Sequence, residues 1–229
     1  MSIVAIIPAR GGSKGIPRKN LTQIAGRPLI SYSIKAAQNA TSVNRILIST
    51  DDSEIADVAG ELGAEVPFLR PSELADDNAG MLGVLQHALE WLESQGVEVE
   101  ALVLLQPTSP LRTSRHIEEA ITLFRSTSVS SVVSVVEVPH QFSPISLMKL
   151  SAKGTLSPFI SGQISVTRRQ DKPKLYARNG PALLICHPKT LRAGHLYGDF
   201  CLPYLMSHED SLDIDEPEDI LRIRQFMRN

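Results

Sequence analysis

Cysteines, histidine pairs and long apolar runs are all scarce in this chain of 229 residues, and each shortage excludes a class of protein. The only cysteines, Cys186 and Cys201, lack CxxC spacing, which argues against a disulfide framework and a zinc site. The six histidines include no pair at metal-ligand spacing. No apolar run approaches the roughly 18 residues of a membrane span, and no basic segment precedes the apolar run Ile3–Ile7. We therefore expect a cytoplasmic protein without a secretory leader or a membrane partner.

The composition is that of a globular protein, but its charges are unevenly distributed. Hydrophobic residues make up 42% and charged residues 21%, which disfavours disorder, collagen-like repeats and coiled coil. The net charge is only -2, yet residues 1–50 hold seven Lys or Arg and no Asp or Glu, and residues 139–198 hold nine against one. Two basic stretches indicate an anionic ligand or, as the alternative, a solvated basic face. With a pI near 6.3, a small phosphorylated ligand is favoured over a nucleic acid.

Short apolar runs alternate with amphipathic stretches over the first 138 residues. Four runs rich in Val, Ile and Leu predict buried strands, at Ile3–Ile7, Arg45–Ser49, Ala101–Leu105 and Ser131–Val138. Apolar residues at helical spacing predict helices between them, for example around Leu82–Leu92. This alternation predicts an α/β fold with an open, doubly wound, mostly parallel, Rossmann-like sheet in a single domain covering residues 1–229. Ligands of such sheets bind at the carboxyl ends of the strands.

The strand–helix alternation breaks between about residues 139 and 180. Pro, Ser, Gly and basic residues interleave there with short alternating segments, which favours a small antiparallel insertion. We expect this insertion to act as a lid or a dimerisation arm. Returning strands are predicted at Ala182–Cys186 and Leu202–Met206, and a final helix at Pro217–Met227.

The segment after the first predicted strand has the composition of a phosphate-binding loop. Its small residues let backbone N–H groups approach a phosphate chain, and its cations neutralise the phosphate charge. The spacing matches neither Walker A nor GxGxxG, so a P-loop kinase and a Rossmann dehydrogenase lose support. A flexible basic surface loop is the alternative. The candidate phosphate-binding residues are Ala9, Arg10, Gly11, Gly12, Ser13, Lys14, Lys19 and Asn20.

Acidic and apolar residues alternate in Leu212-Asp213-Ile214-Asp215. In an extended segment, residues two apart face the same side, so both carboxylates could hold one hard cation such as Mg²⁺. The alternative is that Asp215 is the N-cap of the last helix, with Glu218 completing a capping box and Pro217 in the first turn.

The first loop, IIPARGGSKGIPRKN, resembles the N-terminal signature of the CMP-sugar synthetases, the cytidylyltransferases that activate N-acylneuraminate and related nonulosonic acids with CTP. Further motifs of this family follow in order: GRPLISYSIKAA at 26–37, STDD at 49–52, RPSELADD at 70–77, LLQPTSPLR at 104–112, RRQD at 168–171, NG at 179–180 and SLDIDEPED at 211–219. The resemblance covers nearly the whole chain. It implies a nucleotidyltransferase fold, CTP and a 2-keto sugar acid as substrates, Mg²⁺ as cofactor, and a homodimer.

The resemblance also implies roles for individual residues. Arg10 and Lys19 would stabilise charge on the reacting phosphates, and Asp213 and Asp215 would hold Mg²⁺. Arg70 and Asp77 would line the cytosine pocket, although Asp77 could instead cap a turn. The residues expected at the sugar are Gln106, Arg169, Arg178, Asn179 and Gly180. Alternatives are a 3-deoxy-manno-octulosonate cytidylyltransferase and a non-catalytic nucleotide-binding regulatory protein.

Overall fold

The computed structural model describes residues 1–13, 15–76, 79–160, 168, 172–180 and 182–227. Its strands are β1 (Ser2–Pro8), β2 (Gln23–Ile24), β3 (Arg27–Pro28), β4 (Arg45–Ser49), β5 (Val99–Leu104), β6 (Ser131–Glu137), β7 (Met148–Leu150), β8 (Leu156–Pro158), β9 (Tyr176–Arg178), β10 (Leu184–Cys186) and β11 (Cys201–Leu205). Its α-helices are α1 (Leu29–Gln38), α2 (Ser53–Glu61), α3 (Met81–Ser94), α4 (Ser114–Arg125), α5 (Pro188–Arg192) and α6 (Pro217–Phe226). Short 3₁₀ helices are η1 (Lys19–Leu21), η2 (Ser72–Leu74), η3 (His140–Phe142) and η4 (Pro144–Ser146).

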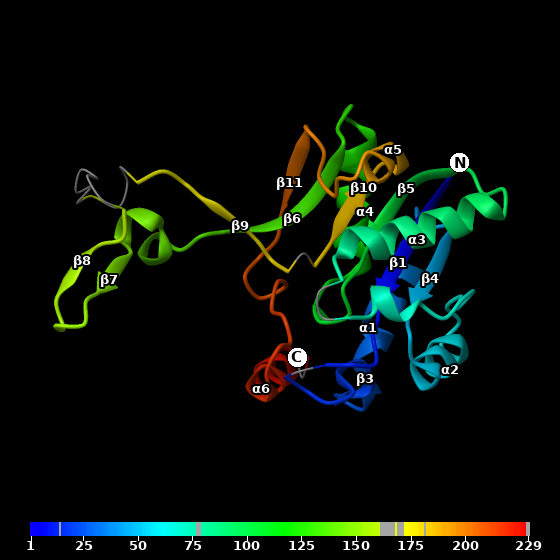
Figure 1. The fold of residues 1–229 in the computed structure, drawn as a ribbon, viewed down its shortest axis with the longest axis horizontal. Coiled ribbons are helices and arrows are strands. Elements are labelled where there is room, and N and C mark those ends of the chain that lie inside the picture. The colour runs from blue at the N-terminus through cyan, green and yellow to red at the C-terminus, as the bar shows by residue number, and fades with distance from the viewer. Residues whose placement is uncertain (14, 77–78, 161–167, 169–171, 181, 228–229) are drawn as a thin grey trace.

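A mostly parallel sheet lies at the centre of the molecule, with strands in the order β11-β6-β10-β5-β1-β4 (Figure 1). Strand β1 pairs in parallel with both β4 and β5, and β11 pairs in parallel with β6. Strand β10 runs antiparallel between β5 and β6, and β9 adds to β6 in antiparallel pairing. The predicted open α/β sheet is confirmed, and the returning segments 182–186 and 202–206 supply β10 and β11.

Both faces of the central strands β1, β5 and β10 are buried, as the continuous apolar runs predict for the first two. Ile3, Ala5 and Ile7 of β1 belong to the core cluster that includes residues of α1, α2 and α4. Val4 and Ile6, which face the opposite side, belong to the cluster that includes residues of α3 and α5. Successive side chains of β1 thus pack against helices on opposite faces of the sheet, which is typical of a doubly wound sheet. In the described residues, no helix combines the length and the apolar character needed to cross a membrane.

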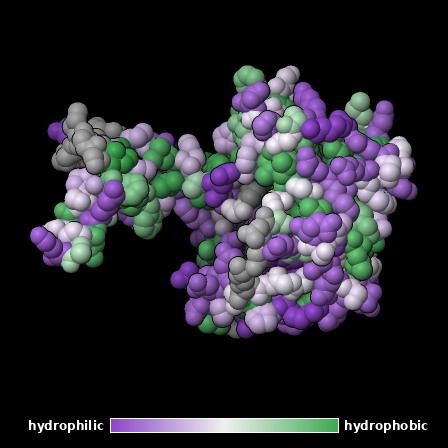
Figure 2. Space-filling view, in the orientation of Figure 1, coloured by the Kyte–Doolittle hydropathy of each residue, from purple (hydrophilic) through white to green (hydrophobic). Residues whose placement is uncertain are grey.

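The chain leaves the sheet after β6 and returns to it at β9 (Figure 1). Between them, η3, η4 and the antiparallel β7–β8 hairpin extend away from the sheet. The hairpin and its base carry exposed apolar side chains, and apolar surface is visible on this extension in Figure 2. We call the described residues 139–160, 168 and 172–178 the arm. The exposed apolar residues of the arm are Phe142, Leu147, Met148, Leu150, Leu156, Phe159, Ile160 and Tyr176.

A third, smaller core cluster joins the two ends of the chain. Ile16 and Ile24, from the segment after β1, pack with Ile214 and with Ile223 of α6. The Arg224 guanidinium adds a hydrogen bond of 3.0 Å to the Gln23 carbonyl oxygen. This packing holds the segment before α6 against the loop that follows β1, although almost the whole chain separates them in sequence.

Candidate active site

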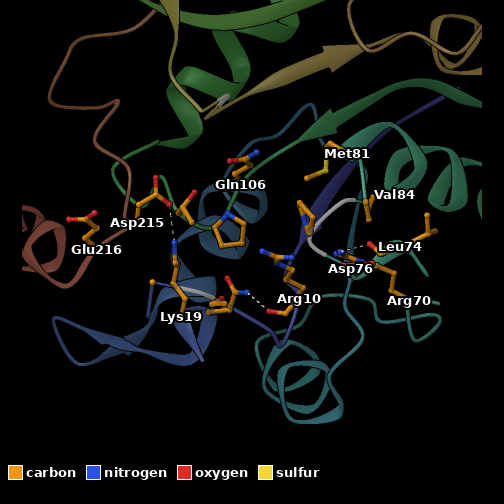
Figure 3. A pocket seen from close by; sticks show the side chains of 17 residues that line it. Arg10, Lys19, Arg70, Leu74, Asp76, Met81, Val84, Gln106, Asp215 and Glu216 are labelled. Carbon is orange, nitrogen blue, oxygen red and sulfur yellow. Dashed lines mark hydrogen bonds and ion pairs between the residues drawn. The ribbon is translucent and has the colours of Figure 1, made fainter. Parts of the chain in front are cut away.

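A pocket of about 560 Å³ opens where β1 and β5 end (Figure 3). Because β1, β4 and β5 are parallel, their carboxyl ends meet at one edge of the sheet, where ligands of such folds bind. Four parts of the chain supply the walls: the loop after β1, the segment from Arg70 to Val84 between β4 and β5, the segment after β5, and the segment before α6. The lining residues include Arg10, Ser13, Gly15, Lys19, Asn20, Arg70, Asp76, Gln106, Thr108, Asp215 and Glu216.

The loop after β1 is fastened by hydrogen bonds at its beginning and end. The Asn20 side-chain amide donates to the Arg10 carbonyl oxygen at 3.0 Å, and the Gly11 N–H donates to Asp51 Oδ1 at 2.9 Å. A Cβ at position 11 would lie 2.6 Å from Asp52 Oδ2, so the approach to the acidic pair after β4 requires glycine. In the described part of the loop, these contacts favour an ordered pocket wall over the alternative of a flexible surface loop.

Arg18 supports this loop rather than lining the pocket. It adopts the left-handed conformation, with φ 54°, and its guanidinium donates to both Asp52 carboxylate oxygens at 3.0 and 3.1 Å and to Glu54 at 2.7 Å. Burial acts to raise the pKa of Asp52, but the hydrogen bonds from Ile55 and Arg18 outweigh it and lower that pKa. One loop cation is thus used to attach the loop to the start of α2.

Lys19 links the loop to the acidic segment before α6. Its ammonium group donates to the Ile214 carbonyl oxygen at 2.7 Å and lies 3.0 Å from Asp215 Oδ1. A Cβ at Gly15 would lie 2.3 Å from the Asp215 carbonyl oxygen, so the backbones approach closely here as well. Figure 3 shows Lys19 directed at Asp215 across the pocket wall. The loop and the acidic segment form one unit.

The two aspartates of this segment lie on either side of a fully buried residue, Ile214. Asp213 accepts a hydrogen bond of 3.3 Å from the Ser109 hydroxyl. Burial raises the pKa of the Asp213 carboxyl, and the neighbouring Asp215 carboxylate raises it further. Asp215 is among the described lining residues of the pocket, whereas Asp213 is not. The carboxylate of Asp215 is nevertheless near enough to raise the pKa of the Asp213 carboxyl.

The alternative role of Asp215 as a helix cap is wrong. The N-cap of α6 is Glu216, Pro217 occupies the first turn, and a capping box joins Glu216 to Asp219. Asp219 also accepts a hydrogen bond of 3.0 Å from the Asp215 N–H. The carboxylate of Asp215 is therefore left to the pocket and to Lys19.

The wall formed after β5 is held by a buried arginine. The Arg112 guanidinium donates to the carbonyl oxygens of Gln106 at 3.0 Å and Ala182 at 2.7 Å, and to Ser33 Oγ at 2.6 Å. Burial lowers the pKa of Arg112 to about 9, and the Asp213 carboxylate opposes this effect. Arg112 thus fixes the backbone from which Gln106 lines the pocket.

Arg70, expected at the cytosine, lines the pocket with a guanidinium that is already engaged. It donates to Ser49 Oγ at 3.0 Å, to the Ser49 carbonyl oxygen and to the Leu74 carbonyl oxygen at 3.4 Å. Burial lowers its pKa to about 10. These bonds attach η2 to the end of β4, so Arg70 shapes the wall of the pocket.

The side chain of Asn179 is likewise occupied by hydrogen bonds within the protein. Its side-chain oxygen accepts a hydrogen bond of 2.6 Å from Ser134 Oγ, and its nitrogen donates to Ser211 Oγ at 2.7 Å. A Cβ at the next residue, Gly180, would lie 3.7 Å from both Gln106 Oε1 and Asp213 Oδ2. The Asn-Gly pair therefore brings the end of the insertion to Gln106 and Asp213.

Arg178 lies elsewhere, on β9, with its guanidinium 4.9 Å from the centre of the Tyr197 ring. It is absent from the described lining of the pocket. Lys14, Asp77 and Arg169, three further residues with predicted roles, lie outside the described residues. Sequence reasoning assigned no role to Gly15, Asp51, Asp52 or Arg112, although all four lie inside the motifs that carried the family resemblance.

The chain matches the cytidylyltransferase family over residues 4–198. It is 34% identical over 221 residues to the CMP-N,N'-diacetyllegionaminic acid synthase of Legionella pneumophila, and the aligned region covers 96% of this chain and 93% of that protein. It is 36% identical over 218 residues to the N-acylneuraminate cytidylyltransferase of Escherichia coli, and there the aligned region covers 95% of this chain and 50% of that protein. The chain thus spans about half the length of several curated relatives that it matches.

Solved structures of other cytidylyltransferases share the fold. A CMP:2-keto-3-deoxy-manno-octonic acid synthetase complexed with CTP superposes with a TM-score of 0.73 at 17% identity, covering 100% of this chain and 99% of that one. A 4-diphosphocytidyl-2C-methyl-D-erythritol synthase from Anaerococcus prevotii superposes with a TM-score of 0.64 at 11% identity, with the same coverage. At these identities the likeness concerns the fold alone. From the family match and the curated relatives, the chain belongs to the cytidylyltransferase family, and within it to the CMP-nonulosonate synthetases.

Proposed function

We propose that this protein transfers CMP from CTP to the anomeric hydroxyl of a nonulosonic, sialic-acid-type 2-keto sugar acid and releases pyrophosphate. The observation that carries the proposal is the convergence of the basic loop after β1, Gln106 and the acidic segment before α6 on one pocket. Its volume of about 560 Å³ is typical of a small-molecule site. The same chain supplies cations for phosphates, an amide for a sugar and a carboxylate pair for a metal.

The nucleotide half of the site is proposed from the loop after β1. Arg10 lines the pocket, and Gly11, Gly12 and Ser13 follow it in the segment fixed between Asn20 and Asp51. No described atom lies within 4 Å of a Cβ built at Gly12, so that position leaves room for a phosphate chain. Backbone N–H groups and cations together favour an anion here.

The proposed metal is Mg²⁺, held by Asp213 and Asp215. The donor chemistry fits, because Mg²⁺ is commonly bound by one or two carboxylates together with substrate phosphates and water. Burial and the Asp215 carboxylate raise the pKa of Asp213, so a cation bound beside this carboxyl would stabilise its charged form. Bound there, the metal would supply Lewis-acid stabilisation of charge on the phosphates. No cluster of three or more His, Cys, Asp or Glu side chains fit for a metal occurs among the described residues.

The proposed reaction is a displacement at the α-phosphorus. The anomeric hydroxyl oxygen forms the new P–O bond, the bond to the β-phosphate breaks, and the hydroxyl proton is released. Lys19 and Arg10, which line the pocket, would stabilise the negative charge that develops on the phosphate oxygens and on pyrophosphate. The side-chain amide of Gln106 can donate to and accept from the sugar. Arg112 holds the backbone that carries it, through a hydrogen bond to the Gln106 carbonyl oxygen.

We propose further that the arm packs on a second copy of the chain to give a homodimer. A two-stranded hairpin is marginally stable by itself, and both β7 and β8 are exposed along their whole length. Their exposed side chains include Leu150 and Leu156, which are 71% and 64% accessible to solvent. An apolar surface of this kind marks an interaction site. In a dimer, the basic residues of the insertion, including Arg168 and Arg169, would reach the sugar carboxylate in the partner's pocket, where an arginine can form two parallel hydrogen bonds.

The test is release of pyrophosphate from CTP and Mg²⁺ in the presence of each of several 2-keto sugar acids. The panel contains N-acetylneuraminate, legionaminate, pseudaminate and 3-deoxy-manno-octulosonate. The proposal predicts turnover with at least one of the first three and no comparable turnover with the fourth. Turnover restricted to 3-deoxy-manno-octulosonate would overturn the sugar class, and CTP binding without turnover on the whole panel would favour a regulatory protein.

A further inference from the structure

The turn that follows β5 contacts the acidic segment before α6 at two points. The Ile214 N–H donates a hydrogen bond of 2.9 Å to the Thr108 carbonyl oxygen, and the Ser109 hydroxyl donates to Asp213 Oδ1 at 3.3 Å. The first contact holds the backbone of the acidic segment, and the second holds the Asp213 side chain. The turn that brings Gln106 to the pocket wall therefore also determines where the Asp213 carboxylate lies.

The backbone of this turn is itself held in place. The Ser109 N–H donates to the Gln106 carbonyl oxygen at 3.4 Å, and the Arg112 N–H donates to the Ser109 carbonyl oxygen at 3.3 Å. The Arg112 guanidinium binds the Gln106 carbonyl oxygen as well, at 3.0 Å. Pro107 and Pro110 restrict φ at two further positions. The Ser109 hydroxyl is thus carried on a backbone that has little freedom to move.

Ser109 is fully buried, with 0% of its surface accessible to solvent. A buried hydroxyl is normally paired within the protein, and among the described residues the Asp213 carboxylate supplies its acceptor. The second oxygen of this carboxylate, Oδ2, lies toward Gly180, where a Cβ would be 3.7 Å from it and 3.7 Å from Gln106 Oε1. The hydrogen bond to Oδ1 therefore sets the direction in which Oδ2 faces.

We propose that Ser109 is a positioning residue for the cation, because its hydroxyl orients the Asp213 carboxylate that would bind the ion. Groups that orient a metal ligand in this way commonly contribute about 10–100-fold to metal affinity. The inference rests on the proposed function, since it takes Asp213 and Asp215 as the metal ligands. Ser109 itself is absent from the described lining of the pocket, so it acts through Asp213 and not by contact with the substrates.

Mn²⁺ is a suitable probe, because it takes the same oxygen ligands as Mg²⁺ and its electron paramagnetic resonance signal is lost on binding. The whole chain is titrated with Mn²⁺ in the absence of CTP. Ser109→Ala is expected to weaken Mn²⁺ binding at least about tenfold, and Asp213→Asn at least as much. Ser31→Ala is the matched control. It removes a hydroxyl from a residue on α1 that is only 7% exposed, and that hydroxyl has no hydrogen-bond partner among the described residues, so Mn²⁺ binding should not change.

The affinity for CTP in the presence of EDTA separates positioning of the metal ligand from a general loss of structure. Calorimetric titration should give Ser109→Ala a Kd for metal-free CTP within about twofold of the wild type, because the nucleotide contacts are proposed at the separate loop after β1. A parallel loss of Mn²⁺ and metal-free CTP binding in Ser109→Ala would overturn the positioning role.

The two aspartate and serine variants also distinguish failure of this inference from failure of the proposed function. Wild-type Mn²⁺ affinity in Ser109→Ala, combined with weak affinity in Asp213→Asn, would overturn the role of Ser109 and leave the metal site standing. Wild-type Mn²⁺ affinity in Asp213→Asn, or no saturable Mn²⁺ binding by the wild type, would overturn the metal site and this inference with it.

Discussion

A Cβ on residue 15 would lie 2.3 Å from the carbonyl oxygen of Asp215, so Gly15 allows the loop after β1 to cross directly beside the acidic segment. The contact is with backbone, which cannot rotate away as a side chain can. Lys19 lies in the same crossing, bonded to Ile214 and Asp215. The relative position of the phosphate loop and the proposed metal ligands therefore depends on the absence of one methyl group.

Gly15→Ala should separate these two segments. We expect kcat/KM for pyrophosphate release to fall at least about tenfold and the free energy of unfolding in urea to fall by about 1–3 kcal/mol, as for other overpacked sites. Gly60→Ala is the matched control, because no described atom lies within 4 Å of a Cβ at Gly60 in α2. The control should keep full activity and gain up to about 1 kcal/mol from helix propensity. Wild-type kcat/KM in Gly15→Ala would contradict this account of the crossing.

Arg112→Leu should destabilise the protein and impair the reaction together. The change removes the donors for the Gln106 and Ala182 carbonyl oxygens, and Ala182 is completely buried. We expect a loss of about 2–4 kcal/mol in urea unfolding. Arg115→Leu, which removes an exposed cation one turn away, should cost under about 1 kcal/mol. Equal stability of the two variants would show that the buried guanidinium is not needed.

His116 should make the stability of the protein depend on pH. Its Nδ1 accepts a hydrogen bond of 3.2 Å from the Thr113 N–H in the capping box of α4, and burial lowers its pKa below the usual 6.5. Below pH 6.5 the unfolded chain binds a proton that the folded chain excludes, so this contribution to stability is present above pH 6.5 and is lost as the pH falls.

His116→Gln should remove this dependence, because Gln can complete the same capping box without titrating. The fall in unfolding free energy between pH 7.5 and 5.5 should be smaller in the variant than in the wild type, as measured by urea denaturation at both pH values. His208→Gln, at an exposed position, should behave like the wild type. An unchanged pH dependence in His116→Gln would contradict the assignment.

The arm provides a prediction about assembly. Replacing both Leu150 and Leu156 by Glu should convert the proposed dimer to a monomer, because two charges would be buried in an apolar contact. Light scattering after gel filtration measures the mass directly, with the wild type expected at twice the mass of one chain. Lys153→Glu, between the two strands, changes charge without touching either leucine and should remain dimeric. A monomeric wild type would leave the exposed apolar surface of the arm without a partner.

Much of the fold follows from the sequence because its signals are local. The four apolar runs of the first 138 residues became β1, β4, β5 and β6, and the alternation around Ile214 correctly predicted a buried residue between two aspartates. The alternative that makes Asp215 the cap of α6 is wrong by one residue. Pro217 could have decided it, because Pro favours the first helical position and so indicates Glu216 as the cap.

Other features of the site depend on contacts that no local pattern encodes. Arg18 and Lys19 are neighbours in the sequence, yet one binds Asp52 and the other Asp215, because the left-handed turn at Arg18 sends them apart. From the sequence, Asn179 is expected to contact the sugar. In the structure its side chain binds Ser134 and Ser211, which come from distant segments. Pairings of this kind are set by the tertiary fold.

Asp213 and Asp215 are proposed to form the metal site of a cytidylyl transfer, and the turnover of Asp215→Asn at saturating Mg²⁺ tests this role most directly. Asp215 is exposed, so the variant should fold normally. Glu209→Gln removes another exposed carboxylate from the nearby chain and is expected to retain wild-type turnover. We predict that kcat for Asp215→Asn falls by at least about two orders of magnitude through lost electrostatic stabilisation and positioning. A kcat close to that of the wild type and of Glu209→Gln would contradict the account.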